Sequence, residues 1–427
     1  MNKPMRKTLC LVMALLLVMS LFSVQAFAAD FVPALDTNAD GRIRVVGTYN
    51  NFESLEAEFD AFNHYYPNVE LSYTRLDDFN NIISTALMGD KPNIFFSYPW
   101  MVGKDQYTPV FEAMENLNDP ALGIDLSCIR PELLYTDSEG RVPMAPVFST
   151  TYGMLINEAL FEKLGLEVPT SYSGLLAACE AFRAAGYDTP ILGYYDTGSS
   201  MLYSLIYPYA CGLLKDRPEA VEALNSFAPG AGEYIRPVLE LTKDFMDSGC
   251  VNKEVCTSLA DNYNAMILRF FEGDIPMMFC NGDTVSGTGK REAQSDAFQA
   301  NPFPYSFWPI PVTEEGGWFV TLVPMSFSVN VNCDDLDMTN EFMRFLLSTK
   351  ELNELARIKR LLTASTDLSL DGVYAAFSKV DPARSLYAEA LGLMDEPCRE
   401  LRRAAYAVAE GTMSVDEAVE SFGTLEG

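Results

Sequence analysis

Histidine is nearly absent from this 427-residue sequence, and its scarcity limits the chemistry available to the chain. Ser–His–Asp and Cys–His nucleophile systems need a histidine base, and many zinc and iron sites need several histidines. The single histidine, His64, falls in a segment of helical periodicity just before Tyr65-Tyr66-Pro67, where a surface or packing role is expected. We therefore predict no catalytic residue, no metal site and no cofactor.

Carboxylates are abundant, with 59 Asp and Glu residues, but their spacing isolates no catalytic pair. A glycoside hydrolase needs one protonated and one ionised carboxyl close together, and no short motif marks such a pair. Residues 36–43, DTNADGRI, match the first half of an EF-hand calcium loop. The twelfth position, which needs a bidentate acid, is Gly47, so we predict no calcium site.

Side chains suited to a polar, ring-shaped ligand recur in loops that follow predicted strands. Aromatic faces stack on the C–H side of a sugar ring, and Asp and Asn bridge neighbouring hydroxyls. The alternative role of the aromatic residues is ordinary packing, and that of the aspartates is a turn or helix cap. The candidate ligand-binding residues are Tyr49, Asn50, Asn51, Tyr98, Trp100, Thr151, Tyr152, Asp196, Asn281, Asp283, Trp308 and Trp318.

The first residues have the pattern of a secretory signal peptide. Basic residues precede an apolar run from Leu9 to Val24, and Ala26-Phe27-Ala28 supplies the small residues of a cleavage site. The run is short for a membrane span, and Cys10 lies before its centre rather than at the cleavage point. We expect cleavage after Ala28, no lipid anchor, and an exported, soluble protein of 399 residues, extracellular, at the cell surface or in the periplasm.

The elements that must position the candidate residues alternate between strands and helices. This alternation predicts an α/β protein with parallel strands covered by helices, and no G-x-G-x-x-G fingerprint follows the first strand. A second α/β unit begins after residue 141. The predicted strands are Ile43–Gly47, Val69–Tyr73, Asn93–Ser97, Pro190–Tyr194, Phe270–Phe279 and Pro324–Asn330, and the helices include Phe52–Tyr66, Phe79–Met88, Glu158–Leu164 and Asn340–Arg360.

Charge and cysteine usage restrict the partners and the cross-links. The formal net charge of −29 makes a surface that repels nucleic acid and anionic lipid headgroups, so we predict no nucleic-acid partner. Eight cysteines follow the signal peptide, without a dense short-range framework. We expect most of them to be free and buried, and Cys250 and Cys256 to be the pair if a disulfide forms.

Four stretches resemble the extracellular solute-binding proteins of bacterial ABC importers, the large two-lobed carbohydrate-associated family. They are YPNVE at 66–70, LMGDKPNI at 87–94, the segment 140–172 and FEGDIPMM at 271–278. Asn93 stands where the family usually has Asp, and Ile156 where it usually has Tyr. The resemblance implies a periplasmic-binding-protein-like fold, in which two α/β lobes joined by hinge crossings hold a ligand in the cleft between them.

The resemblance also implies a division of the chain and a function. We expect a signal peptide at 1–28, a linker at 29–41, lobe 1 at 42–147 plus 284–335, and lobe 2 at 148–283 plus 336–427. The implied function is capture of a sugar or oligosaccharide by a monomer, without catalysis, and its delivery to an ABC permease in the membrane. The alternatives are a sensory protein that docks a membrane receptor and a secreted glycoside hydrolase.

Overall fold

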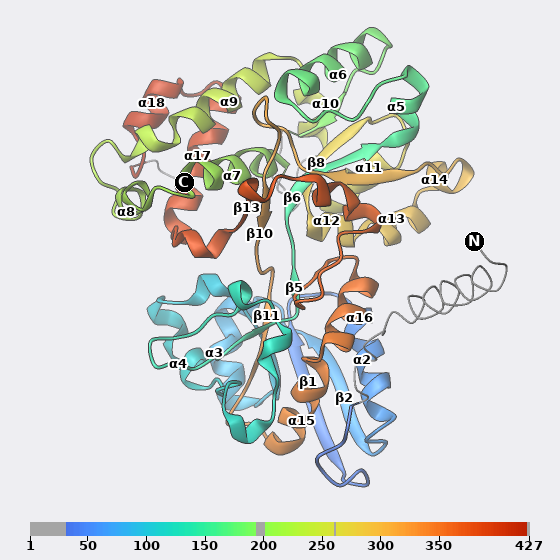
Figure 1. Cartoon of the computed structure of the whole chain (residues 1–427), viewed down its shortest axis with the longest axis vertical. Coiled ribbons are helices and arrows are strands. Elements are labelled where there is room, and N and C mark those ends of the chain that lie inside the picture. Colours follow the sequence, from blue (N-terminus) through green and yellow to red (C-terminus); the bar gives the residue numbers. More distant parts are fainter. Residues whose placement is uncertain (1–30, 194–200, 260–261, 425–427) are drawn as a thin grey trace, which may run out of the picture.

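The structure is a computed structural model that describes residues 31–193, 201–259 and 262–424. Two lobes lie one above the other and are joined by extended segments that run between them (Figure 1). Each lobe has its own large cluster of buried apolar side chains. The predicted two-lobed α/β architecture is therefore confirmed.

Lobe 1, the lower lobe in Figure 1, is built on a sheet whose strands run in the order β2-β1-β3-β11-β4. β1 pairs in parallel with β2 and β3, as the alternation of strands and helices predicted. β11 arrives from late in the chain and pairs antiparallel with β3 and β4. The strands are β1 (Gly41–Gly47), β2 (Val69–Arg75), β3 (Ile94–Ser97), β4 (Ala145–Pro146) and β11 (Ser326–Val329).

The helices of lobe 1 come from both ends of the chain. The predicted helix Asn340–Arg360 is two helices, because Ser348 leaves the helical conformation and caps the second one, its Oγ accepting a hydrogen bond from the backbone N–H of Glu351. His64 is exposed just after the first helix, as expected for a surface residue. The helices are α2 (Glu53–Asn63), α3 (Phe79–Gly89), α4 (Thr108–Glu112), α15 (Leu336–Leu346) and α16 (Thr349–Lys359).

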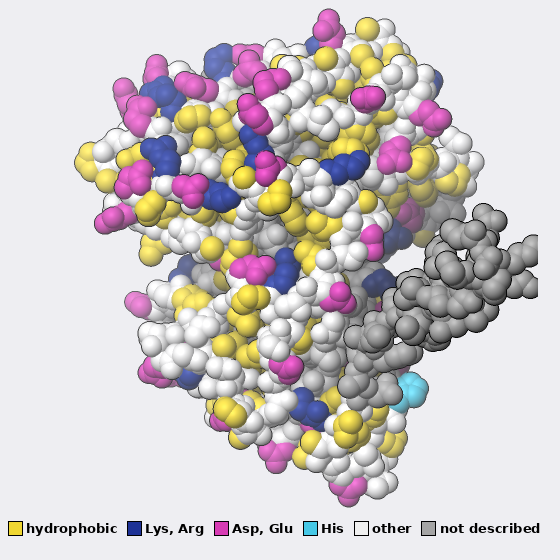
Figure 2. All heavy atoms as spheres, in the orientation of Figure 1, with side chains coloured by type: hydrophobic (Ala, Val, Ile, Leu, Met, Phe, Trp, Pro, Cys, Tyr) yellow, Lys and Arg dark blue, Asp and Glu magenta, His cyan; other side chains and the backbone are white. Residues whose placement is uncertain are grey.

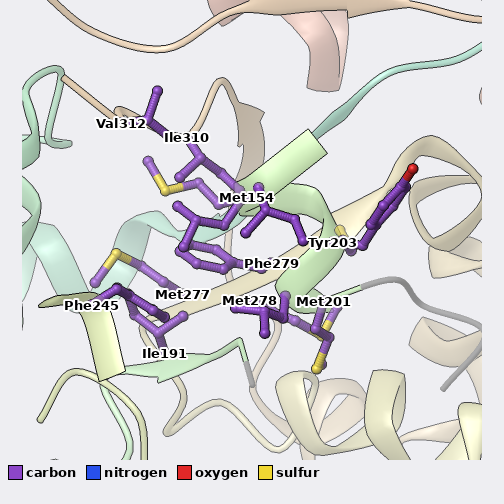
Figure 3. Close-up of a cluster of buried hydrophobic side chains, with 14 of the residues drawn as sticks. Met154, Ile191, Met201, Tyr203, Phe245, Met277, Met278, Phe279, Ile310 and Val312 are labelled. Carbon is purple, nitrogen blue, oxygen red and sulfur yellow. The ribbon is translucent and has the colours of Figure 1, made fainter. Parts of the chain in front are cut away.

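Lobe 2 is built on a sheet with the order β7-β8-β6-β9. β7 is parallel to β8, whereas β6 is antiparallel to both β8 and β9. Both faces of the sheet are buried: Met154 and Phe279, which are paired across β6 and β8, lie on one face, and Met278 lies on the other. Phe279 stacks on Phe245 at 5.3 Å between ring centroids (Figure 3). The strands are β6 (Tyr152–Asn157), β7 (Ile191–Leu192), β8 (Met277–Asn281) and β9 (Tyr305–Trp308).

Helices surround the lobe 2 sheet. The predicted helix Glu158–Leu164 is present with those bounds, whereas the predicted strand Phe270–Phe279 begins only at Met277, because Phe270 ends a helix. The longer helices of this lobe are α6 (Tyr172–Ala184), α7 (Met201–Leu214), α8 (Pro218–Asn225), α9 (Arg236–Asp247), α11 (Tyr263–Phe270) and α17 (Asp395–Glu410). The shorter ones are α5 (Glu158–Leu164), α10 (Lys253–Ser258), α12 (Gly282–Ser286), α13 (Thr288–Gln294), α14 (Asp296–Ala300) and α18 (Val415–Glu420).

The crossings between the lobes are short strand pairs. β5 (Phe148–Ser149) pairs with β12 (Leu362–Thr363), and β10 (Phe319–Thr321) pairs with β13 (Ser385–Tyr387). A bridge between Thr150 and Leu322 joins the two crossings. Because extended segments can rotate at a few backbone positions, these crossings form the hinge about which the lobes move.

The structure corrects two of the expected lobe boundaries. Residues 284–308, expected in lobe 1, pack in lobe 2, where Phe298 lies 5.2 Å from Phe271 between ring centroids. Helices α15 and α16, expected in lobe 2, pack in lobe 1, where Phe342 lies 5.1 Å from Phe62. The chain thus returns to each lobe later than expected, since the apolar faces of these helices match the other core.

The cysteines within residues 31–193, 201–259 and 262–424 are free. Cys250, expected to pair with Cys256 if a disulfide formed, instead has the Cys179 thiol as its hydrogen-bonding neighbour. Both sulfurs are buried in the lobe 2 core, where a free thiol packs as a small apolar group.

Candidate functional site

Polar and aromatic side chains from the two lobes converge on Asp283. Asp283 is the second residue of α12, the helix that directly follows strand β8. The end of this strand therefore places Asp283 at the edge of lobe 2 that faces lobe 1. The preceding Gly282 allows a close approach of the crossing, since a Cβ there would lie 2.1 Å from the Thr150 Oγ1. Asn281 caps α12, because its Oδ1 accepts a hydrogen bond from the Thr284 N–H at 3.1 Å.

The Asp283 carboxylate is desolvated and has little compensation from its neighbours. Within the described residues it takes part in no hydrogen bond and no ion pair. Burial raises the pKa of this carboxyl, and the positive charge of Lys359 only partly opposes the rise. A desolvated carboxylate without a donor is costly, so the site favours a ligand that donates hydrogen bonds to it.

Phenol side chains from both lobes surround this carboxylate. Burial raises their pKa values first, and the negative charge of Asp283 raises them further, so that all remain protonated at neutral pH. The pKa reaches about 12 for Tyr98 and about 12 for Tyr263. An uncharged phenol both donates and accepts hydrogen bonds. The phenols are Tyr49 and Tyr98 in lobe 1 and Tyr152, Tyr263 and Tyr374 in lobe 2.

The lobe 1 wall is an aromatic surface that follows strands β1 and β3. Tyr98 stacks on Trp100 with ring centroids 5.4 Å apart and an interplanar angle of 23°, and Trp100 keeps 36% of its surface exposed. The Tyr98 hydroxyl lies 3.1 Å from the Thr48 Oγ1. Tyr49 packs edge-on against Phe52. A stacked pair of rings with Trp100 exposed offers a platform for the face of a sugar ring.

Lys359, which the sequence analysis did not single out, adds a cation to the lobe 1 wall. It ends α16, and its Nζ lies 4.3 Å from the centroid of the Tyr49 ring. Among the described residues its ammonium has no hydrogen bond and no ion pair. Burial lowers the pKa of this amine, against the charges of Asp283 and Glu53. An acid on lobe 2 and a base on lobe 1 therefore face the same space.

The lobe 2 wall continues through a tyrosine cluster that the sequence analysis also missed. Tyr203 and Tyr207, one turn apart on α7, stack with centroids 4.9 Å apart. Both meet Tyr152 edge-on, at 5.7 and 5.6 Å. The Arg402 guanidinium lies 4.7 Å from the Tyr203 centroid. The i, i+4 spacing of two tyrosines in an otherwise apolar helix is the signal that could have found them.

The structure separates the predicted ligand-binding residues into groups. Tyr49, Tyr98, Trp100, Tyr152 and Asp283 come together around the space between the lobes. Others have local roles or stand apart: Asn50 accepts a hydrogen bond from Arg75, Asn51 is exposed, Thr151 is buried with its backbone oxygen bonded to the Gly282 N–H, Asn281 is a helix cap, and Asp196 lies outside the described residues.

Trp308 and Trp318 do not join the Asp283 cluster. Trp308 lines a separate cavity of about 130 Å³ in lobe 2, together with Pro309, Ala376 and Lys379. The Trp318 ring packs against α7 at Gly212, where a Cβ would lie 2.1 Å from the ring. Both rings therefore serve lobe 2 packing or the separate cavity, a correction to their predicted place in the cleft.

Comparison with known proteins identifies the family. Residues 57–383 match the family model described as bacterial extracellular solute-binding protein. The chain belongs to this family. Its members are binding proteins, in agreement with the expectation that the chain binds a ligand rather than transforms it. A sequence search of curated proteins finds no match.

Solved structures of binding proteins share the fold of this solute-binding protein. A Bacillus licheniformis sugar transporter in complex with stachyose has 18% identity and a TM-score of 0.63, covering 89% of this chain and 98% of its own. RafE with raffinose has 16% identity and a TM-score of 0.68, with coverage of 89% and 98%. The GacH receptor of Streptomyces glaucescens, with 19% identity and a TM-score of 0.65, covers 90% and 97%.

Two further findings concern the described residues alone. They include no helix long and apolar enough to cross a bilayer. They also hold no group of three or more His, Cys, Asp and Glu side chains that could ligate a metal ion.

Proposed function

We propose that this solute-binding protein captures a sugar or oligosaccharide between its lobes, around Asp283, and delivers it to an ABC permease. The observation that carries the proposal is the unpartnered Asp283 carboxylate, which faces protonated phenols from both lobes. Sugar hydroxyls donate to a carboxylate and exchange hydrogen bonds with phenols. A ligand that contacts both walls stabilises the closed arrangement of the lobes.

The composition of the walls supports a saccharide over other solutes. The Tyr98–Trp100 stack offers aromatic faces, and Asp283 and Lys359 offer an acceptor and a donor on opposite lobes. Together these two groups carry no net charge, which suits an uncharged polyol. The ligands named for proteins of the same fold, stachyose and raffinose, are of this kind.

The two alternatives are less well supported. A glycosidase needs a second carboxyl close to the first, and the charged group that acts on Asp283 is Lys359, a base. A sensory protein would bind the same ligand in the same way and dock a receptor instead of a permease. We favour an exported, soluble protein, as the N-terminal pattern predicts, and propose that it acts as a monomer.

The test is a thermal-shift screen of the purified protein against raffinose, stachyose and xylo-oligosaccharides. Amino acids, peptides and polyamines are the controls. A sugar at about 100 times its Kd adds about 2.7 kcal/mol to the free energy of unfolding, so the melting temperature rises. A rise with one saccharide, without its consumption, supports the proposal. A rise only with a control class would overturn the ligand, and release of a shortened sugar would revive the hydrolase.

A further inference from the structure

An ion pair between Lys104 and Asp395 joins the two lobes directly. Lys104 lies in the loop between β3 and α4 in lobe 1, and Asp395 is the first residue of α17 in lobe 2. The Lys104 Nζ lies 2.9 Å from the Asp395 Oδ2, and the side chains keep 31% and 33% of their surface exposed. We propose that this pair is a latch that favours the closed arrangement of the lobes, and that Lys104 is a positioning residue for ligand capture.

The latch lies away from the hinge. Helices α4 and α17 lie on the left of Figure 1, whereas α16 and α13, on the right, are joined by another interlobe ion pair, Arg360–Glu292, at 3.0 Å. Arg360 is two residues from the crossing strand β12, so it moves little when the lobes rotate. Figure 2 shows an indentation between the lobes on the left. We therefore expect rotation about the crossings to separate Lys104 from Asp395 before it separates Arg360 from Glu292.

The same lysine contacts the aromatic wall of the candidate site. Its Nζ lies 4.8 Å from the centroid of the Trp100 ring, within the range of a cation–π interaction. Trp100 in turn stacks on Tyr98, which senses the charge of Asp283. One ammonium group thus links lobe closure to the position of the ring platform. This link is why we assign Lys104 a positioning role rather than a purely structural one.

Asp395 keeps a partner within its own lobe when Lys104 is absent. Arg399, one turn further along α17, lies 2.5 Å from the same carboxylate oxygen. The carboxylate also lies at the N-terminal end of a 16-residue helix, where a negative charge is favourable. Removal of Lys104 therefore leaves no buried, unpaired charge. The variant without Lys104 is expected to fold like the wild type and to differ from it only in how often the lobes are closed.

The test is small-angle X-ray scattering of the protein without added sugar, at low salt and at about 0.5 M NaCl, where screening shortens to a few ångströms. For the wild type we expect a larger radius of gyration at high salt. For Lys104→Met we expect the larger radius of gyration at both salt concentrations. The reason is that loss of a partly shielded ion pair raises the ratio of open to closed molecules by about two- to fivefold. Lys104→Arg keeps the charge and restores the wild-type response.

Three further variants make the result specific. Asp395→Asn removes the same pair from the other lobe, and the double variant Lys104→Met/Asp395→Asn is expected to expand no more than either single one. Lys243→Met is the matched control, because Lys243 pairs with Asp247 inside α9. The latch is overturned if Lys104→Met and Asp395→Asn keep the wild-type scattering and salt response, or if Lys243→Met changes them equally.

The role of the latch in capture rests on the proposed function, but the latch itself does not. The scattering experiment contains no sugar, so its failure removes the latch and leaves the thermal-shift evidence for a ligand untouched. A failed sugar screen would likewise leave the salt response of the lobes as it is.

Discussion

The two walls of the cleft are built from different kinds of structural element. Lobe 1 presents Tyr49 and Tyr98, which come directly after parallel strands and pack on the aromatic core of that lobe. Lobe 2 presents Asp283 after a strand, but its phenols have three different origins: Tyr152 begins strand β6, Tyr263 begins helix α11, and Tyr374 comes from a segment late in the chain. Lobe 1 also carries the uncompensated cation, Lys359, and lobe 2 the uncompensated anion.

The recognition surface therefore has a part fixed by strand topology and a part assembled by helix packing. The lobe 1 rings follow from strand topology, since carboxyl ends of parallel strands meet at one edge. The positions of Tyr263 and Tyr374 in lobe 2 depend instead on how helical segments pack around the sheet. A ligand that contacts both walls interacts with the charges of both Lys359 and Asp283. The variants below separate the contribution of each wall to ligand binding from its contribution to packing.

The largest expected effect separates two tryptophans. Trp318→Ala is expected to lower the free energy of unfolding by about 3 kcal/mol, because the ring packs against α7, and to leave sugar affinity unchanged. Trp100→Ala is expected to weaken sugar binding by about 1–3 kcal/mol through lost stacking, with little change in stability. Chemical denaturation and titration calorimetry on both variants measure the contrast. If Trp318→Ala weakened sugar binding and Trp100→Ala did not, the sugar would bind beside Trp318 in lobe 2 and not at the Tyr98–Trp100 stack.

Asp283→Asn tests the anionic wall. Loss of hydrogen bonds to a charged group is expected to weaken sugar binding by about 1.5–3 kcal/mol. The same change removes a desolvated carboxylate, so the melting temperature of the sugar-free protein is expected to rise. Asp247→Asn, at an exposed position on α9, is the matched control and should alter neither property. Wild-type affinity in Asp283→Asn would remove the acid from the site.

Glu58, a buried acid of lobe 1, can be compared with Asp283, because it is also desolvated but lies in the lobe core and not in the candidate site. Burial and the neighbouring Glu351 raise the pKa of Glu58 from 4.5 to about 9. Between these values Glu58 binds more protons in the folded protein than in the unfolded chain, so its contribution to the free energy of unfolding is fully present below about pH 4.5 and is lost as pH rises toward 9.

The decline has a slope of at most about 1.4 kcal/mol per pH unit for one group. Glu58→Gln should flatten this slope in denaturation curves taken at several pH values and leave sugar affinity as it was. An unchanged slope would mean that Glu58 is ionised in the folded protein.

The smallest expected effect concerns the cap that orients Asp283. Asn281→Ala removes the hydrogen bond to the Thr284 N–H and should cost about 1 kcal/mol of stability. Because α12 carries Asp283, affinity should fall slightly as well. Ser348→Ala, which removes a comparable cap at α16, is the control. Loss of affinity far beyond that of Asp283→Asn would make Asn281 a ligand contact instead.

Strand ends were the part of the site that could be predicted. Tyr49, Tyr98 and Asp283 follow strands whose apolar runs and flanking turns are legible in the sequence. Lys359 and Tyr203 were missed because a residue on a helix reaches the cleft only through the packing of that helix, which periodicity alone does not give.

The errors in the fold have the same origin. The apolar faces of α15 and α14 can both be recognised from the spacing of their apolar residues. The sequence does not indicate which lobe core each helix covers. Trp308 and Trp318 were placed in the cleft because each stands near prolines and glycines, and their actual neighbours, Lys379 and Gly212, are distant in sequence.

The most direct test of the central claim is a crystal structure of the protein with the saccharide that raises its melting temperature most. We expect the sugar to lie between the lobes, with hydroxyls bonded to the Asp283 carboxylate and a ring face on Trp100 or Tyr98. A sugar bound in the lobe 2 cavity beside Trp308, with no contact to Asp283, would contradict it.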